Sequence, residues 1–396
     1  MTYTFELSKP LADYGRTLRD WSTAYVRPHA RQADTQHAPP ENWREILDGC
    51  PVPIGRVDLP EPSPLPDFEE GFWVSNLVMY ENLNYGDLWP LALLNTNIGH
   101  LVVDAMGTPE QIERWYKPAI EEGQGWAFAL TEPGFGSDTS QVATTATRDG
   151  DTWILNGSKI YCSNGASADF ISVFATTDKA LGPKGIHAFV VPRDTPGCLV
   201  AKANEDKLGV RSWLTSEMVF DNCVIPVENQ LGWSPDGQSG GRTAGRGGAL
   251  ATLSHNRPNM SAIVIGLAQA SIDVTTDLLT ERRLGFTPRR WSAATDDLAL
   301  MNASLQRARR MNARAQFLVD QGNPNPSASA AAKAYAPETA ERVIARCMQL
   351  LGPDGYSQDL LLEKWYRDAK IIDIFEGTGQ IQRIVVARSL MGRLAG

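Results

Sequence analysis

The 396-residue sequence predicts a mostly helical α+β protein whose strands are confined to the middle of the chain. Apolar residues recur at helical spacing from Leu11 to about Gly125, and this spacing returns after Ala249 and continues to the end. Between these regions, short runs rich in β-branched and aromatic residues are separated by Gly, Pro, Asn and Asp, as in strands joined by turns. Because a chain this long exceeds one hydrophobic core, we expect an N-terminal helical domain, a middle β-domain and a C-terminal helical domain over residues 1–125, 126–232 and 233–396.

The first region predicts helices interrupted by one loop. Residues 60–66 (PEPSPLP) predict a proline-rich loop, whereas the stretch from Phe72 to Met106 is apolar at helical spacing. Thr108 is followed three positions later by Gln111, which is nearly a capping box, so we expect a helix to begin there.

The middle region predicts a small antiparallel β-barrel or β-sandwich. A parallel nucleotide-binding sheet would need strands and helices in regular alternation, and that alternation is missing here. The third region opens with a glycine-rich hinge over residues 233–248, which favours a flexible surface loop. The β-rich runs are 152–155, 171–176, 187–191, 218–220 and 223–225.

Composition argues against several classes of function. The net charge is −9 and no basic face is visible, which argues against a nucleic-acid-binding protein. We find neither a secretory signal at the N-terminus nor an apolar window as long as a membrane span. The five cysteines are odd in number and widely spaced, as expected of reduced thiols in a cytoplasmic protein. The five histidines show no spacing suited to zinc, so we expect no metal.

One turn of the middle region offers groups that could bind a ligand. In residues 131–138 (TEPGFGSD), Gly134 and Gly136 would let backbone amides approach a ligand closely, while Thr131 and Ser137 offer hydroxyls. The motif lacks the third glycine and the following helix of a dinucleotide-binding fingerprint, so we reject that kind of site.

A second segment pairs an aromatic with a hydroxyl. In residues 157–165 (GSKIYCSNG), Tyr161 precedes Ser163 by two positions, so the period of a strand places both on one face. A flat heterocycle could stack and be hydrogen-bonded there, although an aromatic on a strand is more often part of a core.

The C-terminal region contains a candidate catalytic base. Residues 371–378 (IIDIFEGT) place Glu376 in a nearly continuous apolar stretch, and such surroundings make a carboxylate more basic, as general-base catalysis requires. Gly377 permits a sharp turn that could aim Glu376 inward; the alternative is a helix-end carboxylate that touches solvent. Residues 237–241 (GQSGG) formally match the nucleophile elbow of hydrolases, but no strand precedes them.

Taken in order, five motifs make essentially the whole chain resemble the acyl-CoA dehydrogenase family. One such motif is modest support, whereas five in the right order and spacing are highly specific. The resemblance implies an N-terminal helical domain, a middle β-barrel or β-sandwich domain and a C-terminal four-helix bundle, with FAD between the β-domain and the bundle. The motifs are TEPGFGSD (131–138), GSKIYCSNG (157–165), KLGVRS (207–212), VFDNCVIPVEN (219–229) and RDAKIIDIFEGTGQIQR (367–383).

The resemblance also implies a reaction and a set of site residues. Glu376 would take the α-proton of an acyl-CoA thioester while the β-hydrogen leaves as hydride to flavin N5, giving a trans-2-enoyl-CoA. Arg257 would lie behind the base and favour its charged form. Residues expected at the cofactor are Phe128, Leu130, Thr131, Ser137, Tyr161, Ser163, Arg282, Gln349, Thr378 and Gln380; residues expected at the substrate are Ser137, Ser254, Arg257 and Gly377.

The chain departs from the family pattern at several positions. Tyr161 and Ser163 replace a usual tryptophan and threonine, and Ser254 replaces an acidic residue, which affects the expected contact with pantetheine. Further departures fall in the set that contacts the FAD of a neighbouring subunit, namely Glu281, Leu284, Ser292 and Pro353.

The resemblance implies partners and leaves alternatives open. A homotetramer is implied, with a heteromeric assembly as the alternative, and an electron-transfer flavoprotein is the expected electron acceptor. The acyl group would be carried by CoA or by a carrier protein. Two other functions fit the same fold: a flavin-dependent monooxygenase, whose members usually lack the glutamate, and a non-catalytic subunit.

Overall fold

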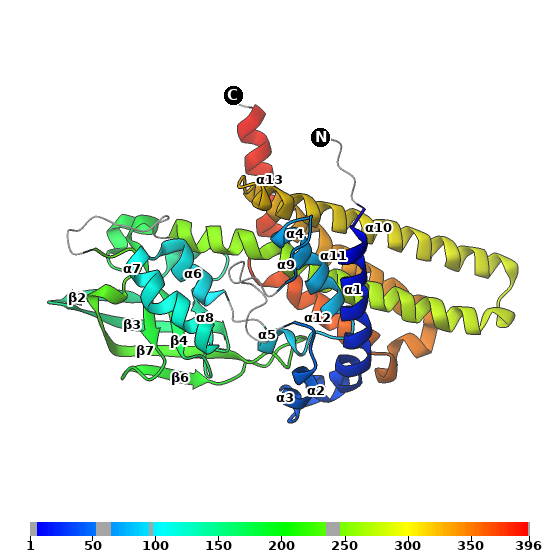
Figure 1. Cartoon of the computed structure of the whole chain (residues 1–396), viewed down its shortest axis with the longest axis horizontal. Helices are drawn as coiled ribbons and strands as arrows, with labels where there is room; N and C mark the ends of the chain where they lie inside the picture. The colour runs from blue at the N-terminus through cyan, green and yellow to red at the C-terminus, as the bar shows by residue number, and fades with distance from the viewer. Residues whose placement is uncertain (1–5, 53–64, 95–97, 235–245, 395–396) are drawn as a thin grey trace.

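The structure is a computed structural model that describes residues 6–52, 65–94, 98–234 and 246–394. Along the chain, the strands follow one group of helices and precede another, which confirms the predicted order. In space the strands lie at one end of the molecule, on the left in Figure 1. The N-terminal helices are α1 (Lys9–Trp21), α2 (Ala30–Gln36), α3 (Trp43–Asp48), α4 (Phe72–Leu83), α5 (Leu91–Leu94), α6 (Gly99–Met106), α7 (Pro109–Gln111) and α8 (Lys117–Glu122). The strands are β1 (Trp126–Ala129), β2 (Thr145–Asp149), β3 (Thr152–Ser163), β4 (Phe170–Thr176), β5 (Ile186–Pro192), β6 (Cys198–Lys202) and β7 (Thr215–Pro226). The C-terminal helices are α9 (Arg246–Glu281), α10 (Pro288–Asp320), α11 (Pro326–Leu351), α12 (Leu362–Ile374) and α13 (Gly379–Leu394).

The predicted helix start at Thr108 is confirmed. Thr108 Oγ1 accepts a hydrogen bond from the Gln111 backbone at 3.2 Å, and Gln111 Oε1 accepts one from the Thr108 backbone at 3.0 Å. This pair is a complete capping box, which satisfies two N–H groups that a helix start leaves without partners. Three other predicted segments fall wholly or mostly outside the described residues: the proline-rich loop (60–66), the glycine-rich hinge (233–248) and GQSGG (237–241).

Within the described residues, seven strands form one sheet in the order β1-β4-β2-β3-β7-β6, with β5 pairing β4. Most pairs are antiparallel, as predicted, but β4 runs parallel to β1 and, over one residue pair, to β2. The sequence patterns missed β1, β2 and β6, and they divided β7 into two runs. Of the missed strands, β2 and β6 are five residues each and largely exposed, so their apolar alternation is weak.

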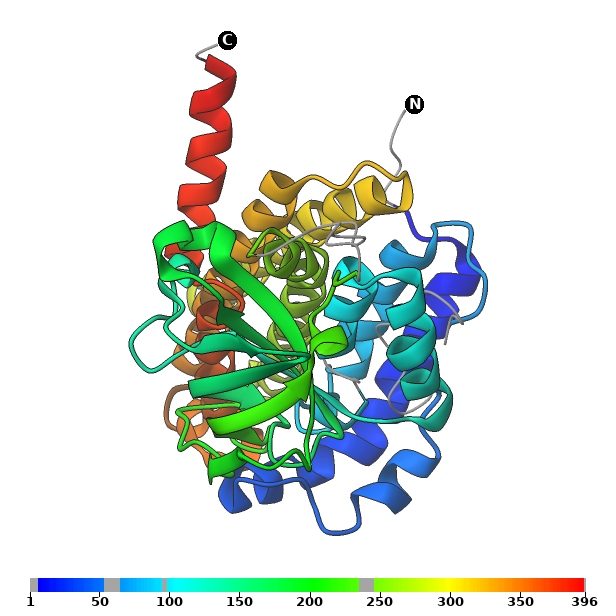
Figure 2. The same ribbon diagram turned by 90° about the vertical axis from the view of Figure 1, so that its left-hand side faces the viewer.

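The two faces of the sheet have different neighbours. Phe189 and Val191 of β5 belong to the core on one face, whereas Ala188 and Val190 point to the other face and pack with α6 and α8. Helices α6 to α8 (cyan in Figure 2) lie beside the sheet, while α1 to α4 share a hydrophobic core with α9 to α12. The N-terminal helices therefore divide between the sheet and the C-terminal helices.

Helix α9 is the long central helix of the molecule. From Gly247 to Glu281 it is apolar and long enough, by length and composition, to cross a membrane. This corrects the statement from sequence that no such window exists. In the fold, 67% of its most apolar window is buried against other elements, as in the core helix of a globular protein.

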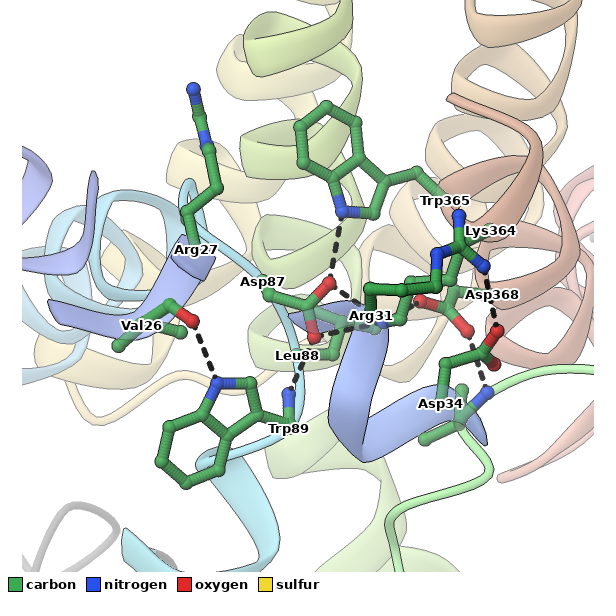
Figure 3. A network of polar contacts seen from close by, with 12 residues as sticks. Val26, Arg27, Arg31, Asp34, Asp87, Leu88, Trp89, Lys364, Trp365 and Asp368 are labelled. Atoms are coloured by element: carbon green, nitrogen blue, oxygen red, sulfur yellow. Dashed lines mark hydrogen bonds and ion pairs between the residues drawn. The ribbon is translucent and has the colours of Figure 1, made fainter. Parts of the chain in front are cut away.

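A buried ionic network fixes α12 against the N-terminal helices and the middle region (Figure 3). Lys364 Nζ donates to Asp87 Oδ2 at 2.6 Å and to Asp368 Oδ2 at 2.7 Å, and its side chain is only 3% exposed. Asp368 Oδ1 also accepts a hydrogen bond from the Val210 backbone at 2.6 Å. Helix α12 is therefore anchored both to Asp87, which follows α4, and to Val210 of the middle region. It ends two residues before Glu376.

Candidate active site

Glu376 lies in the sharp turn between α12 and α13. After the helix, Phe375 is extended (φ −74°, ψ 163°), whereas Glu376 and Gly377 have φ values of 58° and 91°. A left-handed backbone costs a residue with a side chain roughly 1–2 kcal/mol, so surrounding contacts must hold Glu376 there. A Cβ at Gly377 would lie 2.3 Å from Gln382 Nε2. Gly377 therefore permits the sharp turn, as predicted, because its φ of 91° would strain a residue with a side chain.

Two adjacent residues of α9 hold Glu376, and they act on different atoms. Asn256 Nδ2 donates to the carboxylate oxygen Oε1 at 2.7 Å, whereas Arg257 Nε donates to the backbone oxygen at 2.9 Å. Both α9 side chains are buried. The prediction from sequence had Arg257 behind the base and gave Asn256 no part in holding it. The hydrogen bond from Arg257 Nε goes to the main chain of the turn and not to the carboxylate.

Arg257 still acts on Glu376 through its charge. Burial lowers the pKa of the Arg257 guanidinium, and the negative charge of Glu376 opposes that shift. Arginine remains protonated throughout the working range of proteins, so a positive charge stays beside the carboxylate. Arg257 Nη1 also donates to Ser254 Oγ at 3.3 Å, which places Ser254 next to the turn.

A cavity of about 300 Å³ adjoins this part of α9. Ser254 and Leu250 of α9 line it together with Gln316 of α10 and Ser329 of α11. Its wall is mainly apolar with a few polar groups, which is usual for a pocket that binds a small organic molecule. The predicted substrate residue Ser254 thus links the cavity to Arg257.

The segment predicted to bind a ligand, residues 131–138, forms a tight exposed turn. The backbones of Glu132 and Phe135 exchange hydrogen bonds of 3.2 and 3.0 Å across it. A Cβ at Gly134 would meet no described atom within 4 Å, and one at Gly136 would meet only Thr131 Cγ2 at 3.8 Å. The turn therefore leaves its backbone open to a ligand, as predicted, and the exposed Ser137 lies within it.

An ion pair that sequence reasoning missed holds this turn on the sheet. Lys159 Nζ donates to Glu132 Oε1 at 2.7 Å and to the Leu130 oxygen at 3.1 Å, with Lys159 fully buried. The Ala143 and Thr144 backbones also donate to the Glu132 carboxylate. Burial raises the pKa of Glu132, but the charge of Lys159 and these hydrogen bonds outweigh it and lower the pKa overall.

The predicted shared face of Tyr161 and Ser163 is not a regular strand face. The register between β3 and β7 shifts between Lys159 and Cys162, and Tyr161 within this bulge has a φ of 58°. A bulge leaves its extra residue without a ladder partner and breaks the alternation of period two. Tyr161 is 59% exposed, so it presents a free ring rather than a core aromatic.

Trp213 connects the strand end to the base, and sequence reasoning missed it. The backbone of Asn164, next to Ser163, donates to the Leu214 oxygen at 2.8 Å. The ring of Trp213 lies 6.1 Å from that of Phe375, which precedes Glu376. The structure thus brings the end of β3 and the turn with Glu376 into one region. The position of Trp213 directly after the KLGVRS motif was the available signal.

Comparison with known proteins decides the family. The model of the acyl-CoA dehydrogenase middle domain matches residues 127–223, and that of the C-terminal domain matches residues 243–391. The mitochondrial short-chain specific acyl-CoA dehydrogenase of Rattus norvegicus is 33% identical over 383 residues, covering 95% of this chain and 89% of the relative. The chain belongs to the acyl-CoA dehydrogenase family.

Solved structures of acyl-CoA dehydrogenases have the same architecture. Butyryl-CoA dehydrogenase from Megasphaera elsdenii superposes with a TM-score of 0.81 at 27% identity, covering 98% of this chain and 100% of that one. A glutaryl-CoA dehydrogenase from Mycobacterium smegmatis in complex with FADH2 has a TM-score of 0.83 at 24% identity, covering 98% and 95%. The second likeness concerns the fold alone.

Other residues expected at the cofactor of an acyl-CoA dehydrogenase are close in the chain to the 131–138 turn or to the turn with Glu376. Phe128 of β1 is partly buried, with its ring 5.3 Å from that of Phe174. The side chain of Leu130 is in the core, so its backbone is what a ligand could reach. Thr378 Oγ1 accepts a hydrogen bond from the Ile381 backbone at 3.3 Å at the start of α13. Gln380 follows it and is exposed.

Arg282 and Gln349 lie far from this region within one acyl-CoA dehydrogenase chain. Arg282 follows α9, 25 residues after Arg257, which corresponds to about 37 Å along a helix. It forms an ion pair with Asp354, and Gln349 Oε1 accepts a hydrogen bond from Arg346 at 3.0 Å. A single chain therefore does not bring these two residues to the other predicted cofactor residues.

Proposed function

We propose that this acyl-CoA dehydrogenase converts an acyl-CoA thioester to a trans-2-enoyl-CoA, with Glu376 as the base that removes the α-proton. The observation that carries the proposal is the Glu376 carboxylate, held in a left-handed turn by Asn256 and Arg257 near a mainly apolar cavity. FAD is the cofactor, and when bound it supplies an acceptor for the β-hydrogen, which leaves as hydride.

The surroundings of Glu376 suit a base for a weak carbon acid. The α-proton of a thioester is poorly acidic, so its removal needs a carboxylate in a defined position near the reacting carbon. The hydrogen bond from Asn256 orients the carboxylate, and the charge of Arg257 favours its ionised form. The bond from Arg257 to the backbone oxygen holds the strained turn itself.

Residues of the 131–138 turn, of the end of β3 and of the start of α13 suit the chemistry of FAD. The open backbone of 131–138 can approach a flavin ring, and the hydroxyls of Thr131 and Ser163 can bond its polar edge. The exposed ring of Tyr161 can pack beside it. We assign Ser137 to both flavin and substrate. Among the remaining residues, Phe128 and the Leu130 backbone would border the ring, and Thr378 and Gln380 would lie near the phosphates or adenosine.

The cavity beside Ser254 is the proposed entrance for the thioester substrate. Its mainly apolar wall suits an acyl or pantetheine chain, and its lining residue Ser254 accepts a hydrogen bond from Arg257. We assign Arg257 and Gly377 to the substrate as well. Because a short-chain specific acyl-CoA dehydrogenase and a butyryl-CoA dehydrogenase are among the similar proteins, butyryl-CoA is the first substrate to test.

We further propose a cytoplasmic homotetramer that passes electrons to an electron-transfer flavoprotein. In this assembly, Arg282 and Gln349 would contact the FAD of a neighbouring subunit, because they lie far from the site of their own chain. Mass in solution and flavin content of the chain expressed alone test the assembly. About one FAD per chain in a stable tetramer supports the homotetramer, whereas weak flavin retention or a lone dimer favours a heteromer.

Anaerobic bleaching of the flavin by butyryl-CoA tests the proposed reaction. Glu376→Gln keeps the volume of the side chain and removes the base, so we expect unchanged flavin content and a reduction rate at least about 10²–10⁴-fold lower. The matched control is Glu338→Gln, which removes a carboxylate from the exposed side of α11, where it pairs with Arg342. A Glu376→Gln variant with more than a tenth of the wild-type rate would refute the assignment.

The same experiment separates the two alternatives. A monooxygenase would show no anaerobic bleaching by acyl-CoA and would consume oxygen with another substrate. A non-catalytic subunit would be purified without flavin absorbance. Anaerobic bleaching with release of an enoyl-CoA excludes both.

A further inference from the structure

A buried lysine contacts the end of the helix that leads to Glu376. Lys333 of α11 is 0% exposed, and its Nζ donates to the Ile372 oxygen at 2.6 Å and to the Asp373 oxygen at 3.4 Å. These carbonyls belong to the last turn of α12, where a helix leaves its oxygens without partners inside the helix. A cation at this end also meets the negative pole of the helix dipole.

An apolar side chain would fill the same space without the cost of burying a charge. Removing an ammonium from water costs several kcal/mol, so a lysine at this position must be stabilised by specific contacts. In addition to the two carbonyls, the ring of Phe375 lies 5.9 Å from Nζ, within the range of a cation–π interaction. All three contacts are to residues within four positions of Glu376.

The charge of Lys333 interacts with the charges of the site. Burial lowers the pKa of Lys333 to about 8, while the carboxylates of Glu376 and Asp373 raise it and Arg257 of α9 lowers it. Lys370 of α12 lies 3.6 Å from Asp373. On α13, Arg383 pairs with Glu338 of α11. Lys333 is therefore charged at neutral pH and loses its charge above about pH 8.

We propose that Lys333 is a positioning residue for Glu376: its ammonium fixes the last turn of α12, and thereby the left-handed turn that presents the carboxylate, and its charge favours the ionised base. The proposal rests on the proposed function of Glu376. It assigns Lys333 no contact with the substrate or the flavin.

The geometry gives the size of the effect. Only Ile374 and Phe375 separate the contacted Asp373 from Glu376. The rise per residue is about 1.5 Å in a helix and about 3.3 Å in an extended chain, so unwinding one residue of α12 shifts the following turn by about 2 Å. A misplacement of about 1 Å can lower a rate about 10²-fold.

The test compares Lys333→Met with Lys370→Met, which removes a partly exposed lysine that also lies near Asp373. Anaerobic flavin reduction by butyryl-CoA is measured per bound flavin from pH 6 to 9.5. For Lys333→Met we expect a rate about 10–100-fold lower at saturating substrate, with the acidic limb of the pH profile at higher pH. FAD content should remain unchanged, and Lys370→Met should match the wild type. A Lys333→Met variant that loses only thermal stability, with wild-type rate and pH profile, overturns the proposal.

Lys333→Gln serves if the methionine variant does not fold, because glutamine keeps an N–H donor for the carbonyls but carries no charge. Its profile should lack the wild-type limb near pH 8, and a profile identical to the wild type overturns the role of the charge. A reduction rate of the wild type that stays constant from pH 7 to 9.5 would also overturn the role of the Lys333 charge. These outcomes do not bear on the proposed function. That proposal is refuted only if the Glu376→Gln variant remains active, which would show that Glu376 is not the base.

Discussion

Replacing Asn256 by alanine should shift the pH dependence of flavin reduction. The change removes the amide that donates to Glu376 Oε1 at 2.7 Å, at a position only 3% exposed, where water cannot readily replace it. A hydrogen bond to a charged group contributes about 1.5–3 kcal/mol. The ionised carboxylate accepts this bond, so its loss disfavours the active form. Because about 1.4 kcal/mol corresponds to one pH unit, the acidic limb should move up by about 1–2 units.

Rapid-mixing measurements of anaerobic reduction between pH 5.5 and 9 would show the shift. We expect the variant to be about 10–100-fold slower than the wild type on the acidic limb and to approach it at high pH. The matched control is Asn259→Ala, since Asn259 donates to Asn256 Oδ1 at 3.4 Å. The control should leave the limb in place. A decrease of the same factor at every pH in Asn256→Ala would refute the reasoning.

Substitutions at three other residues test the contacts around the turn with Glu376, the 131–138 turn and α12. Arg257→Lys keeps a positive charge but loses the hydrogen bond to the Glu376 backbone oxygen, so flavin reduction should slow without a shift of the acidic limb. Arg257→Ala also removes the charge, so its acidic limb should move to higher pH. Identical pH profiles of the two variants would contradict these separate roles of the hydrogen bond and the charge. Lys364→Met leaves two buried carboxylates without a counter-charge, at a cost of about 3–5 kcal/mol, so an unchanged urea-unfolding midpoint would count against the network. The lowered pKa of Glu132 means that its stabilisation is present above the usual glutamate pKa and is lost as pH falls through the lowered value. Flavin release should therefore increase in acid for the wild type and lose this dependence in Glu132→Gln, as flavin fluorescence would show.

Local patterns predicted the features that depend on a few neighbouring residues. The capping box of Thr108 and Gln111 spans one helical turn, and both side chains act on each other's backbone. Gly377 permits the sharp turn because a residue without a side chain adopts its positive φ without strain. The order of helices and strands followed from periodicity, which each segment carries by itself.

These local patterns could not predict which strands pair or in which register. The bulge that gives Tyr161 a left-handed backbone arises where β3 changes register against β7, more than fifty residues later in the chain. The parallel pairs of β4 likewise depend on which strands are adjacent in the sheet. A sequence window that contains one strand holds no information on its partner.

The sequence by itself determined that Glu376 would stand in an apolar turn, and only the tertiary structure decided what holds it there. Asn256 and Glu376 are 120 positions apart, and consecutive residues on a helix point about 100° apart. Which of Asn256 and Arg257 meets the carboxylate therefore depends on how α9 is rotated against the turn. The burial of Lys333 likewise makes sense only in the tertiary structure, where its ammonium donates to a carbonyl oxygen at the end of α12. Burial made these contacts necessary, because a buried polar group without a partner would cost more than the fold gains from packing it.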